Sequence, residues 1–349
     1  MTCLIACALA APAAAAPPRG FIGITADDVF AGDADYRTSN LSAMAAIGVG
    51  TIRQTFDWST IERSRGAYDF SYHDDFVAKA SAHGIRVLPI LFNPPAFEAP
   101  TAGRATCPPR RMDAFARFAR AVAERYGRGG SLWRERPQVP ANPITAYQIW
   151  NEPSLRQYWC GRPNARRYVA MLRAASRAIE GVDRRARIVT AGIPSSRLRG
   201  AVPADRYIDA MYRAGARRWF DSLGVNPYPR DARQLRRSLA AMRAIMNRHR
   251  DRRGRLWVTE IGWGDRGPRH RLRVGAAGQA RRIRQAFAAI SRGRRRLRLD
   301  GVVYYSWRDV PPYPPRYRDQ WGLHTGLLRQ SGVFKPAFRA FRDGAARMR

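Results

Sequence analysis

Short apolar runs alternate along the chain with longer segments in which apolar residues recur at every third or fourth position. The short runs have the length of buried β-strands, and the longer segments have the period of amphipathic helices. Eight strands are predicted from this pattern, at residues 20–24, 49–54, 85–92, 145–150, 187–191, 220–225, 256–259 and 301–307.

The clearest helical periods lie between these strands. They cover residues 112–122, 208–212, 235–246 and 283–290, and a last helix is expected at 336–342. Gly84 and Gly127 follow two helical segments, where a left-handed C-cap favours glycine. The alternation predicts an α/β fold, a (β/α)8 TIM barrel that forms a single domain over residues 20–349. The alternative is an open doubly wound sheet, but the usual glycine-rich turn after the first strand is missing.

The N-terminal residues 1–16 are apolar and rich in alanine, which predicts a secretory signal peptide. The apolar run is shorter than the roughly 20 residues that a membrane span requires. No Lys or Arg precedes it, which suggests a different translation start, and a frayed apolar N-terminus is the alternative. We expect a secreted, extracellular protein with no membrane span in the remaining chain.

Cysteine and histidine usage bears on disulfides and metals. Cys3 and Cys7 fall within the predicted signal peptide, which leaves Cys107 and Cys160 in the exported chain. An even pair in an exported protein predicts a disulfide, and two free buried thiols are the alternative. The spacing of the cysteines and of the five histidines matches no metal site. We therefore expect neither a metal nor an organic cofactor.

The formal net charge of +35 raises the question of an anionic partner. Lys79 and Lys335 are the only lysines, so almost all of the basic charge is arginine, and it is spread along most of the predicted helices. Such a spread differs from one continuous basic face with interleaved aromatic residues, so we expect no nucleic-acid partner. An anionic polysaccharide remains an alternative partner.

Candidate chemistry stands at the ends of the predicted strands, where barrels of this kind form their active sites. Glu152 follows the fourth strand, and Glu260 ends the seventh. Two carboxylates that face one cleft are what glycoside hydrolysis requires, one as a proton donor and one as a nucleophile. The alternative is that both glutamates form ordinary ion pairs with the many arginines.

The motifs around these glutamates resemble those of clan A glycoside hydrolases, and they are most similar to families 5 and 39. The resemblance runs from FDWSTIERSRGAYDF through WNEP and VTEIGW to GLLRQSGVFKPAFRAF, which is nearly the whole mature chain. It implies hydrolysis with retained configuration, in which Glu152 is the acid/base and Glu260 the nucleophile.

The resemblance also implies roles for other residues. Asn151 would bind the sugar 2-hydroxyl, Arg53 and Tyr228 would support the nucleophile, and Trp307 would be a sugar platform. The full set of expected substrate-binding residues is Arg53, Trp58, Asn93, Asn151, Asn226, Tyr228, Trp263 and Trp307. The sequence departs from many relatives at Asn226, where they have a histidine two residues before the tyrosine. An amide can donate a hydrogen bond there but cannot carry a proton to Glu152.

We expect the two carboxyl groups to differ in protonation state. Glu260, near Arg53 and Tyr228, should stay ionised, whereas Glu152, beside Trp150 and facing a negative charge, should have a raised pKa. We expect their carboxyl groups to lie about 5–5.5 Å apart, as in retaining enzymes.

Several questions about function stay open from sequence. The favoured prediction is a secreted, monomeric glycosidase that cleaves β-linked oligosaccharides, polysaccharides or small glycosides. The rivals are a barrel that binds carbohydrate but has lost turnover, and a basic exported protein that binds an anionic polysaccharide. The loops at residues 93–110 and 310–323 should determine the sugar and whether action is exo or endo.

Overall fold

The computed structural model describes residues 16–100, 106–195, 200–311 and 319–348. The predicted signal peptide, with Cys3 and Cys7, lies outside these residues except for Ala16. Part of the 310–323 loop also lies outside them.

Eight parallel strands form a closed barrel, as predicted. The strands pair in the order β1, β2, β5, β6, β7, β9, β10 and β11, and β11 pairs with β1 to close the ring. Each overlaps one predicted run. Their bounds are β1 Ile22–Thr25, β2 Thr51–Asp57, β5 Arg86–Phe92, β6 Ala146–Ile149, β7 Arg187–Thr190, β9 Ser222–Asn226, β10 Arg255–Ile261 and β11 Leu299–Tyr305.

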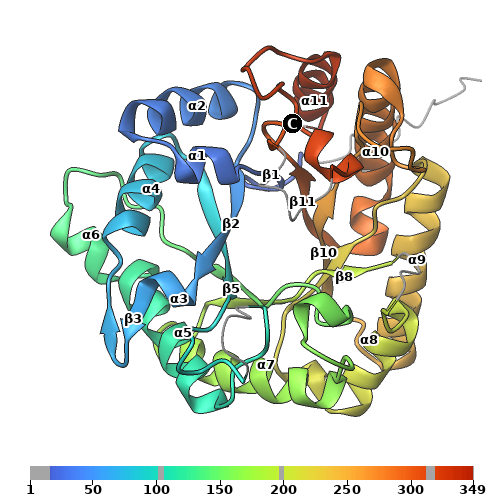
Figure 1. Ribbon diagram of the computed structural model, residues 1–349. Helices are drawn as coiled ribbons and strands as arrows, with labels where there is room; N and C mark the ends of the chain where they lie inside the picture. Colours follow the sequence, from blue (N-terminus) through green and yellow to red (C-terminus); the bar gives the residue numbers. More distant parts are fainter. Residues whose placement is uncertain (1–15, 101–105, 196–199, 312–318, 349) are drawn as a thin grey trace, which may run out of the picture.

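A helix follows each barrel strand, and together the helices form an outer ring around the strands (Figure 1). Their apolar stripes face the barrel, so the main core lies between strands and helices. Their bounds are α2 Ala34–Ala46, α4 Ser71–Ala82, α5 Met112–Tyr126, α7 Ala165–Glu180, α8 Ala204–Arg213, α9 Ala232–Arg248, α10 Gly275–Leu297 and α11 Pro336–Ala346. The last of these is the predicted eighth helix.

Shorter helices, strands and turns lie within the loops. They are the helices α1 Asp27–Ala31, α3 Trp58–Ile61 and α6 Ser131–Glu135, the strands β3 Glu62–Ser64, β4 Ala67–Tyr68 and β8 Ile193–Pro194, and the 3₁₀ turns η1 Arg156–Tyr158, η2 Ala216–Arg218 and η3 Trp321–His324. None of the helices in the described ranges has the length and apolar character that crossing a membrane would need.

A small second cluster fills the barrel itself. Leu88, Val189 and Trp257 come from β5, β7 and β10, none of which is hydrogen-bonded to another of the three, so they meet only across the barrel interior. The cluster forms an apolar layer inside the barrel, with Ala146 packed against it.

The two predicted glycine C-caps differ in the structure. Gly84, after α4, has φ +69°, the left-handed conformation that was expected. Gly127, after α5, has φ −69° and ψ −172°, so the prediction of a left-handed cap there is wrong. Gly127 is instead required for close approach, because a Cβ atom would lie 2.5 Å from the carbonyl oxygen of Ala123.

Candidate active site

The carboxyl ends of the barrel strands surround a cleft of about 470 Å³. Its polar lining includes both candidate glutamates, and its aromatic lining comes from strand ends and loops on several sides of the barrel. The aromatic residues are Phe92, Tyr158, Tyr228, Tyr305 and Trp321. The cleft therefore combines opposed carboxylates with ring faces, as a sugar site requires.

The backbone adopts an uncommon conformation at the strand ends that carry the site. Asn93, Trp150, Glu152 and Tyr228 have φ values of 56°, 72°, 39° and 36°. Such positive values are uncommon for residues other than glycine, and they gather where a fold holds functional groups. Here they follow the ends of β5, β6 and β9, and Asn93, Glu152 and Tyr228 themselves line the cleft.

Arg53, on β2, organises one side of the site. Its guanidinium donates to Glu260 Oε1 at 2.7 Å, to Asn151 Oδ1 at 3.1 Å and to Gln148 Oε1 at 2.6 Å. Only 2% of Arg53 is exposed, so these contacts form away from bulk water. One side chain thus fixes the nucleophile candidate and the amide of Asn151 relative to each other.

Glu260 has a donor on each carboxylate oxygen. Arg53 binds Oε1, and the hydroxyl of Tyr228 donates to Oε2 at 2.5 Å. Burial and the neighbouring Glu260 carboxylate raise the pKa of Tyr228 well above its ordinary value, so the phenol keeps its proton and remains a donor. The carboxylate of Glu260 is therefore held between one guanidinium and one phenol hydroxyl.

Glu152 has a different environment. It is buried, and its Oε1 accepts a hydrogen bond from Asn226 Nδ2 at 2.8 Å. Burial, followed by the charge of Glu260, raises the pKa of Glu152 to about 8. The two carboxyl groups of one cleft therefore have different surroundings, a buried amide contact for Glu152 and two donors, one of them charged, for Glu260.

The structure brings most of the predicted site residues together. Those that line the cleft are Arg53, Asn93, Asn151, Glu152, Tyr228 and Glu260. Asn226 does not line it but stands behind Glu152, as the hydrogen bond shows.

Three predicted substrate-binding tryptophans do not reach the cleft, which corrects the prediction. All three are buried and have other partners: Trp58 stacks on Phe118, whereas the indole NH of Trp263 donates to Pro229 O and that of Trp307 to Asn40 Oδ1. Trp58 thus packs α3 against α5, and Trp307 packs the segment after β11 against α2 and α11.

Sequence reasoning missed several cleft residues. Asp27, just after β1, Tyr305, at the end of β11, and His270, in the loop after β10, line the cleft. A polar residue directly after the first strand is the sequence signal that indicates Asp27. The strand 8 aromatic residue that faces the cleft is Tyr305 instead of Trp307, because β11 ends at Tyr305 and the chain then leaves the sheet.

The predicted disulfide is present. Cys107 and Cys160 are bonded, with their Cα atoms 5.0 Å apart. The bond joins the loop after β5 to the loop after β6, next to Trp159 and to Tyr158, which lines the cleft. It therefore cross-links two loops at the rim.

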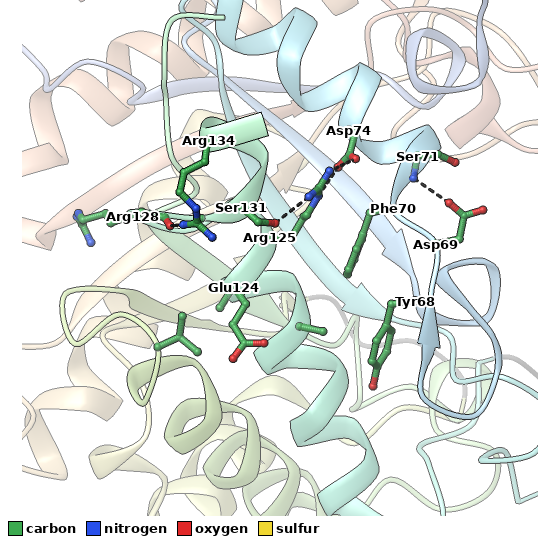
Figure 2. Close-up of a pocket in the computed structure, with 15 residues that line it drawn as sticks. Tyr68, Asp69, Phe70, Ser71, Asp74, Glu124, Arg125, Arg128, Ser131 and Arg134 are labelled. Carbon is green, nitrogen blue, oxygen red and sulfur yellow. Dashed lines mark hydrogen bonds and ion pairs between the residues drawn. The ribbon is translucent and has the colours of Figure 1, made fainter. Parts of the chain in front are cut away.

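A larger hollow, of about 750 Å³, lies outside the barrel between α4, α5 and α6 (Figure 2). Its best-placed charges are already paired: Asp74 accepts two hydrogen bonds from Arg125, which also binds Ser131. Asp69 accepts a hydrogen bond from the backbone NH of Ser71, the first residue of α4. These side chains stabilise the junction of the three helices. The candidate active site is therefore the cleft at the mouth of the barrel, which contains both glutamates.

No sequence-family model and no curated protein matches the chain. Solved structures do match. One is a family 39 glycoside hydrolase from Bacteroides cellulosilyticus (TM-score 0.68, 18% identity, 95% of this chain and 64% of that one). Another is a β-xylosidase from Caulobacter crescentus (TM-score 0.68, 14% identity, 94% and 69%). A third is an exo-β-1,4-mannosidase from an Opitutaceae bacterium (TM-score 0.63, 18% identity, 95% and 59%).

These similarities define the class of fold. The chain has the barrel fold of clan A glycoside hydrolases, as the sequence motifs implied, and structures of family 39 are among those it resembles. The chain spans about two thirds of the length of these structures. Their substrates are properties of those proteins.

Proposed function

We propose that the protein is a retaining glycoside hydrolase that cleaves β-glycosidic bonds by double displacement. The observation that carries this proposal is the opposed setting of two glutamates in one cleft. Glu260 is bound by Arg53 and Tyr228, whereas Glu152 is buried with a raised pKa. When two carboxyl groups have different environments, their pKa values differ. One group can then act as the acid and the other as the nucleophile.

In the first step a carboxylate oxygen of Glu260 attacks the anomeric carbon. The bond from that carbon to the glycosidic oxygen breaks, and the proton of Glu152 moves to the departing oxygen. A glycosyl ester on Glu260 and a free alcohol result. Arg53 and Asn151, which are hydrogen-bonded to each other, hold the nucleophile and the amide that would bind the sugar 2-hydroxyl.

In the second step water replaces Glu260 at the anomeric carbon. Glu152 is then ionised and takes a proton from the water as the new bond forms. Formation of the ester removes the negative charge of Glu260, one of the causes of the raised pKa of Glu152. Its pKa therefore falls in the intermediate, which suits its role as a base. The mechanism requires carboxyl groups about 5–5.5 Å apart, which a crystal structure with a bound inhibitor would measure.

The cleft also suggests how a sugar is recognised. Thr25 Oγ1 and Asn93 Oδ1 are buried and have no hydrogen-bond partner in the described part of the chain. Both residues line the cleft, together with the carboxylate of Asp27. We propose that the polar groups of Asp27 and Asn93 that face the cleft bind sugar hydroxyl groups. Tyr305 and Trp321 would contact the apolar faces of the rings.

Export is the second part of the proposal. The Cys107–Cys160 disulfide supports a secreted location, because disulfides persist in oxidising compartments. An exported hydrolase would act on extracellular glycosides or glycans.

The test is hydrolysis of aryl β-glycosides and β-glycans, with xylosides, mannosides, glucosides and galactosides included. Glu260→Ala should abolish turnover, and azide should restore it with an α-glycosyl azide as product. Glu124→Ala, at an exposed residue paired with Arg120, is the control and should keep full activity. A purified protein that binds these glycans without turnover would instead support the lapsed, carbohydrate-binding barrel.

A second candidate function is binding of an anionic polysaccharide, and one surface favours it. A groove of about 570 Å³ between α9 and α10 is lined by five arginines. None of the five has a carboxylate partner within ion-pair distance among the described residues. They are Arg233, Arg236, Arg282, Arg284 and Arg292. Such a groove would attract carboxylate or sulfate groups and is compatible with catalysis elsewhere.

Retention on a carboxylated polysaccharide at increasing salt tests this candidate. The triple substitution Arg236→Gln, Arg282→Gln, Arg292→Gln should elute at clearly lower salt than a charge-matched control. The control carries Arg173→Gln, Arg184→Gln and Arg206→Gln at exposed positions outside the groove. Equal elution of the two triple variants would mean that net charge alone explains binding.

A further inference from the structure

A chain of contacts behind Glu152 runs from one barrel strand to the next. Asn226, at the end of β9, donates from Nδ2 to Glu152 Oε1 at 2.8 Å. On its other side, Asn226 Oδ1 accepts from the hydroxyl of Thr259, on β10, at 2.7 Å. Asn226 and Thr259 are both fully buried. The amide therefore has a defined orientation, with its NH2 group towards the carboxyl group.

This orientation determines where Glu152 can hold a proton. An NH2 group only donates, so the oxygen that faces it must accept and cannot carry a hydrogen directed at the amide. With Oε1 occupied in this way, the proton of Glu152 is placed on Oε2. If the amide were flipped, its oxygen would accept from a protonated Oε1 and draw the proton away from the substrate. The Thr259 hydroxyl favours the first arrangement because its contact with Asn226 Oδ1 is shorter than its 3.3 Å contact with Val225 O.

Gly192, in the connection between β7 and β8, leaves space for the Asn226 amide. A Cβ atom at Gly192, between β7 and β8, would lie 2.2 Å from Asn226 Oδ1, 2.6 Å from its Cγ and 2.7 Å from its Nδ2. All three distances are far inside van der Waals contact. Even an alanine would therefore push the amide off its present position.

We propose, on the basis of the function proposed above, that Asn226, Thr259 and Gly192 form a socket that places the catalytic proton on Oε2 of Glu152. Asn226 is a positioning residue that acts through Glu152, and Gly192 and Thr259 act through Asn226. The amide does not titrate, so the socket adds no ionisation of its own to the pH profile.

If the socket places the proton, the loss of kcat/KM in socket variants should depend on the leaving group. Proton donation matters for a poor leaving group such as phenol and hardly at all for 2,4-dinitrophenol, which departs as an anion. General acid catalysis contributes roughly 10²–10⁴-fold. We expect Asn226→Ala and Gly192→Ala to lower kcat/KM at least about 10-fold for the phenyl glycoside and less than about threefold for the dinitrophenyl glycoside. Thr259→Val should do the same, whereas Thr259→Ser should recover activity because it keeps the hydroxyl.

A double-mutant cycle tests the link between the glycine and the amide. If Gly192→Ala acts only through Asn226, it should have no further effect on kcat/KM once the Asn226 side chain is removed. Independent, multiplicative losses in the double variant, or equal losses on both glycosides, would overturn the socket. Melting temperatures of all variants identify any that fail to fold, and Thr259→Ser remains informative if Gly192→Ala does not fold.

The pH profile is an independent readout. The hydrogen bond from Asn226 lowers the pKa of Glu152 against the larger opposing effects of burial and Glu260. Its loss in Asn226→Ala should move the alkaline limb of kcat/KM to higher pH, while Asn226→His should add a new ionisation. Glu152→Ala separates the two hypotheses. If it lacks the leaving-group dependence, the proposed function fails; if it shows the dependence and the socket variants do not, only the socket fails.

Discussion

Arg53 and Glu260 form a buried ion pair, with 2.7 Å between Arg53 Nη1 and Glu260 Oε1. The same guanidinium reaches Asn151 and Gln148, so it connects β2, β6 and β10 across the mouth of the barrel. A lysine would keep the charge but not the planar fork of donors that reaches three acceptors.

We therefore expect Arg53→Lys to reduce kcat/KM by about 10²–10³-fold, comparable to the loss of one electrostatic donor in an active site. The matched control is Arg37→Lys. Arg37 is also buried and paired with a carboxylate, Asp75, at 2.6 Å, but it does not line the cleft. Similar losses of activity in both variants would contradict a specific role for Arg53 and indicate a general effect on folding.

The pH dependence of the reaction follows from the pKa of Glu152. The protonated form is the active one in the first step, so kcat/KM should be present below the raised pKa and lost as the pH rises through about 8. The limb should appear with a phenyl glycoside and weaken with a dinitrophenyl glycoside. A limb of equal size and position for both substrates would assign it to another group.

The negative charge of Glu260 is the second cause of that raised pKa, after burial. Glu260→Gln removes this charge and should lower the pKa of Glu152. Carbon-13 NMR of labelled glutamate carboxyl groups would follow the titration directly, without a need for turnover. The control is Glu98→Gln, which removes a carboxylate outside the cleft lining and should leave the titration of Glu152 unchanged.

The sequence was sufficient to predict the barrel and to place Glu152 and Glu260 at one cleft. Parallel strands buried on both faces appear as short apolar runs, and all eight runs became strands. Glu152 and Glu260 were recognisable because a carboxylate directly after such a run must lie at the mouth of the barrel. Asn226 was expected to bind substrate, yet its contact is with Glu152.

The aromatic lining could not be predicted in the same way. Trp263 and Trp307 stand just after strand ends, and Tyr305 is the last residue of β11, yet the two tryptophans pack inside and Tyr305 lines the cleft. Trp321, in the later turn η3, also lines it. Residue type predicts that an indole will be covered, not whether a neighbouring loop or a sugar covers it. That choice depends on how the loops after β10 and β11 fold against each other, which is a long-range property.

Removal of the disulfide should destabilise the protein and loosen the rim of the cleft. The bond closes a loop between residues 53 positions apart, for which the loss of chain entropy in the unfolded state corresponds to about 4 kcal/mol. We expect the double variant Cys107→Ser, Cys160→Ser to lose roughly that free energy of unfolding in urea and to have a raised KM. Reductant should lower the free energy of unfolding of the wild type and leave that of the double variant unchanged. A wild type insensitive to reductant under unfolding conditions would argue against the bond.

Lys335 is one of two lysines in a chain whose basic charge is otherwise arginine. Its amino group is fully buried and bonds Asp265 at 2.8 Å, Asp309 at 2.6 Å and the carbonyl of His324 at 3.2 Å. Asp265 lies just after β10 and Asp309 just after β11, so Lys335 ties together two loops whose neighbouring residues form a wall of the cleft. A guanidinium is larger than an ammonium group, and here the ammonium group is fully buried among its three partners.

Lys335→Arg should therefore destabilise the protein by about 1–3 kcal/mol through overpacking, although it preserves the charge. Lys79→Arg is the matched control, since Lys79 is only partly buried in an i,i+4 pair with Asp75, where the change should stay within about 0.5 kcal/mol. Urea unfolding of both variants gives the comparison, and kcat/KM reports whether the cleft wall has shifted. If the two substitutions cost the same, the preference for lysine at position 335 would not come from the size of the site, and the loops after β10 and β11 would have to tolerate a larger cation than their packing indicates.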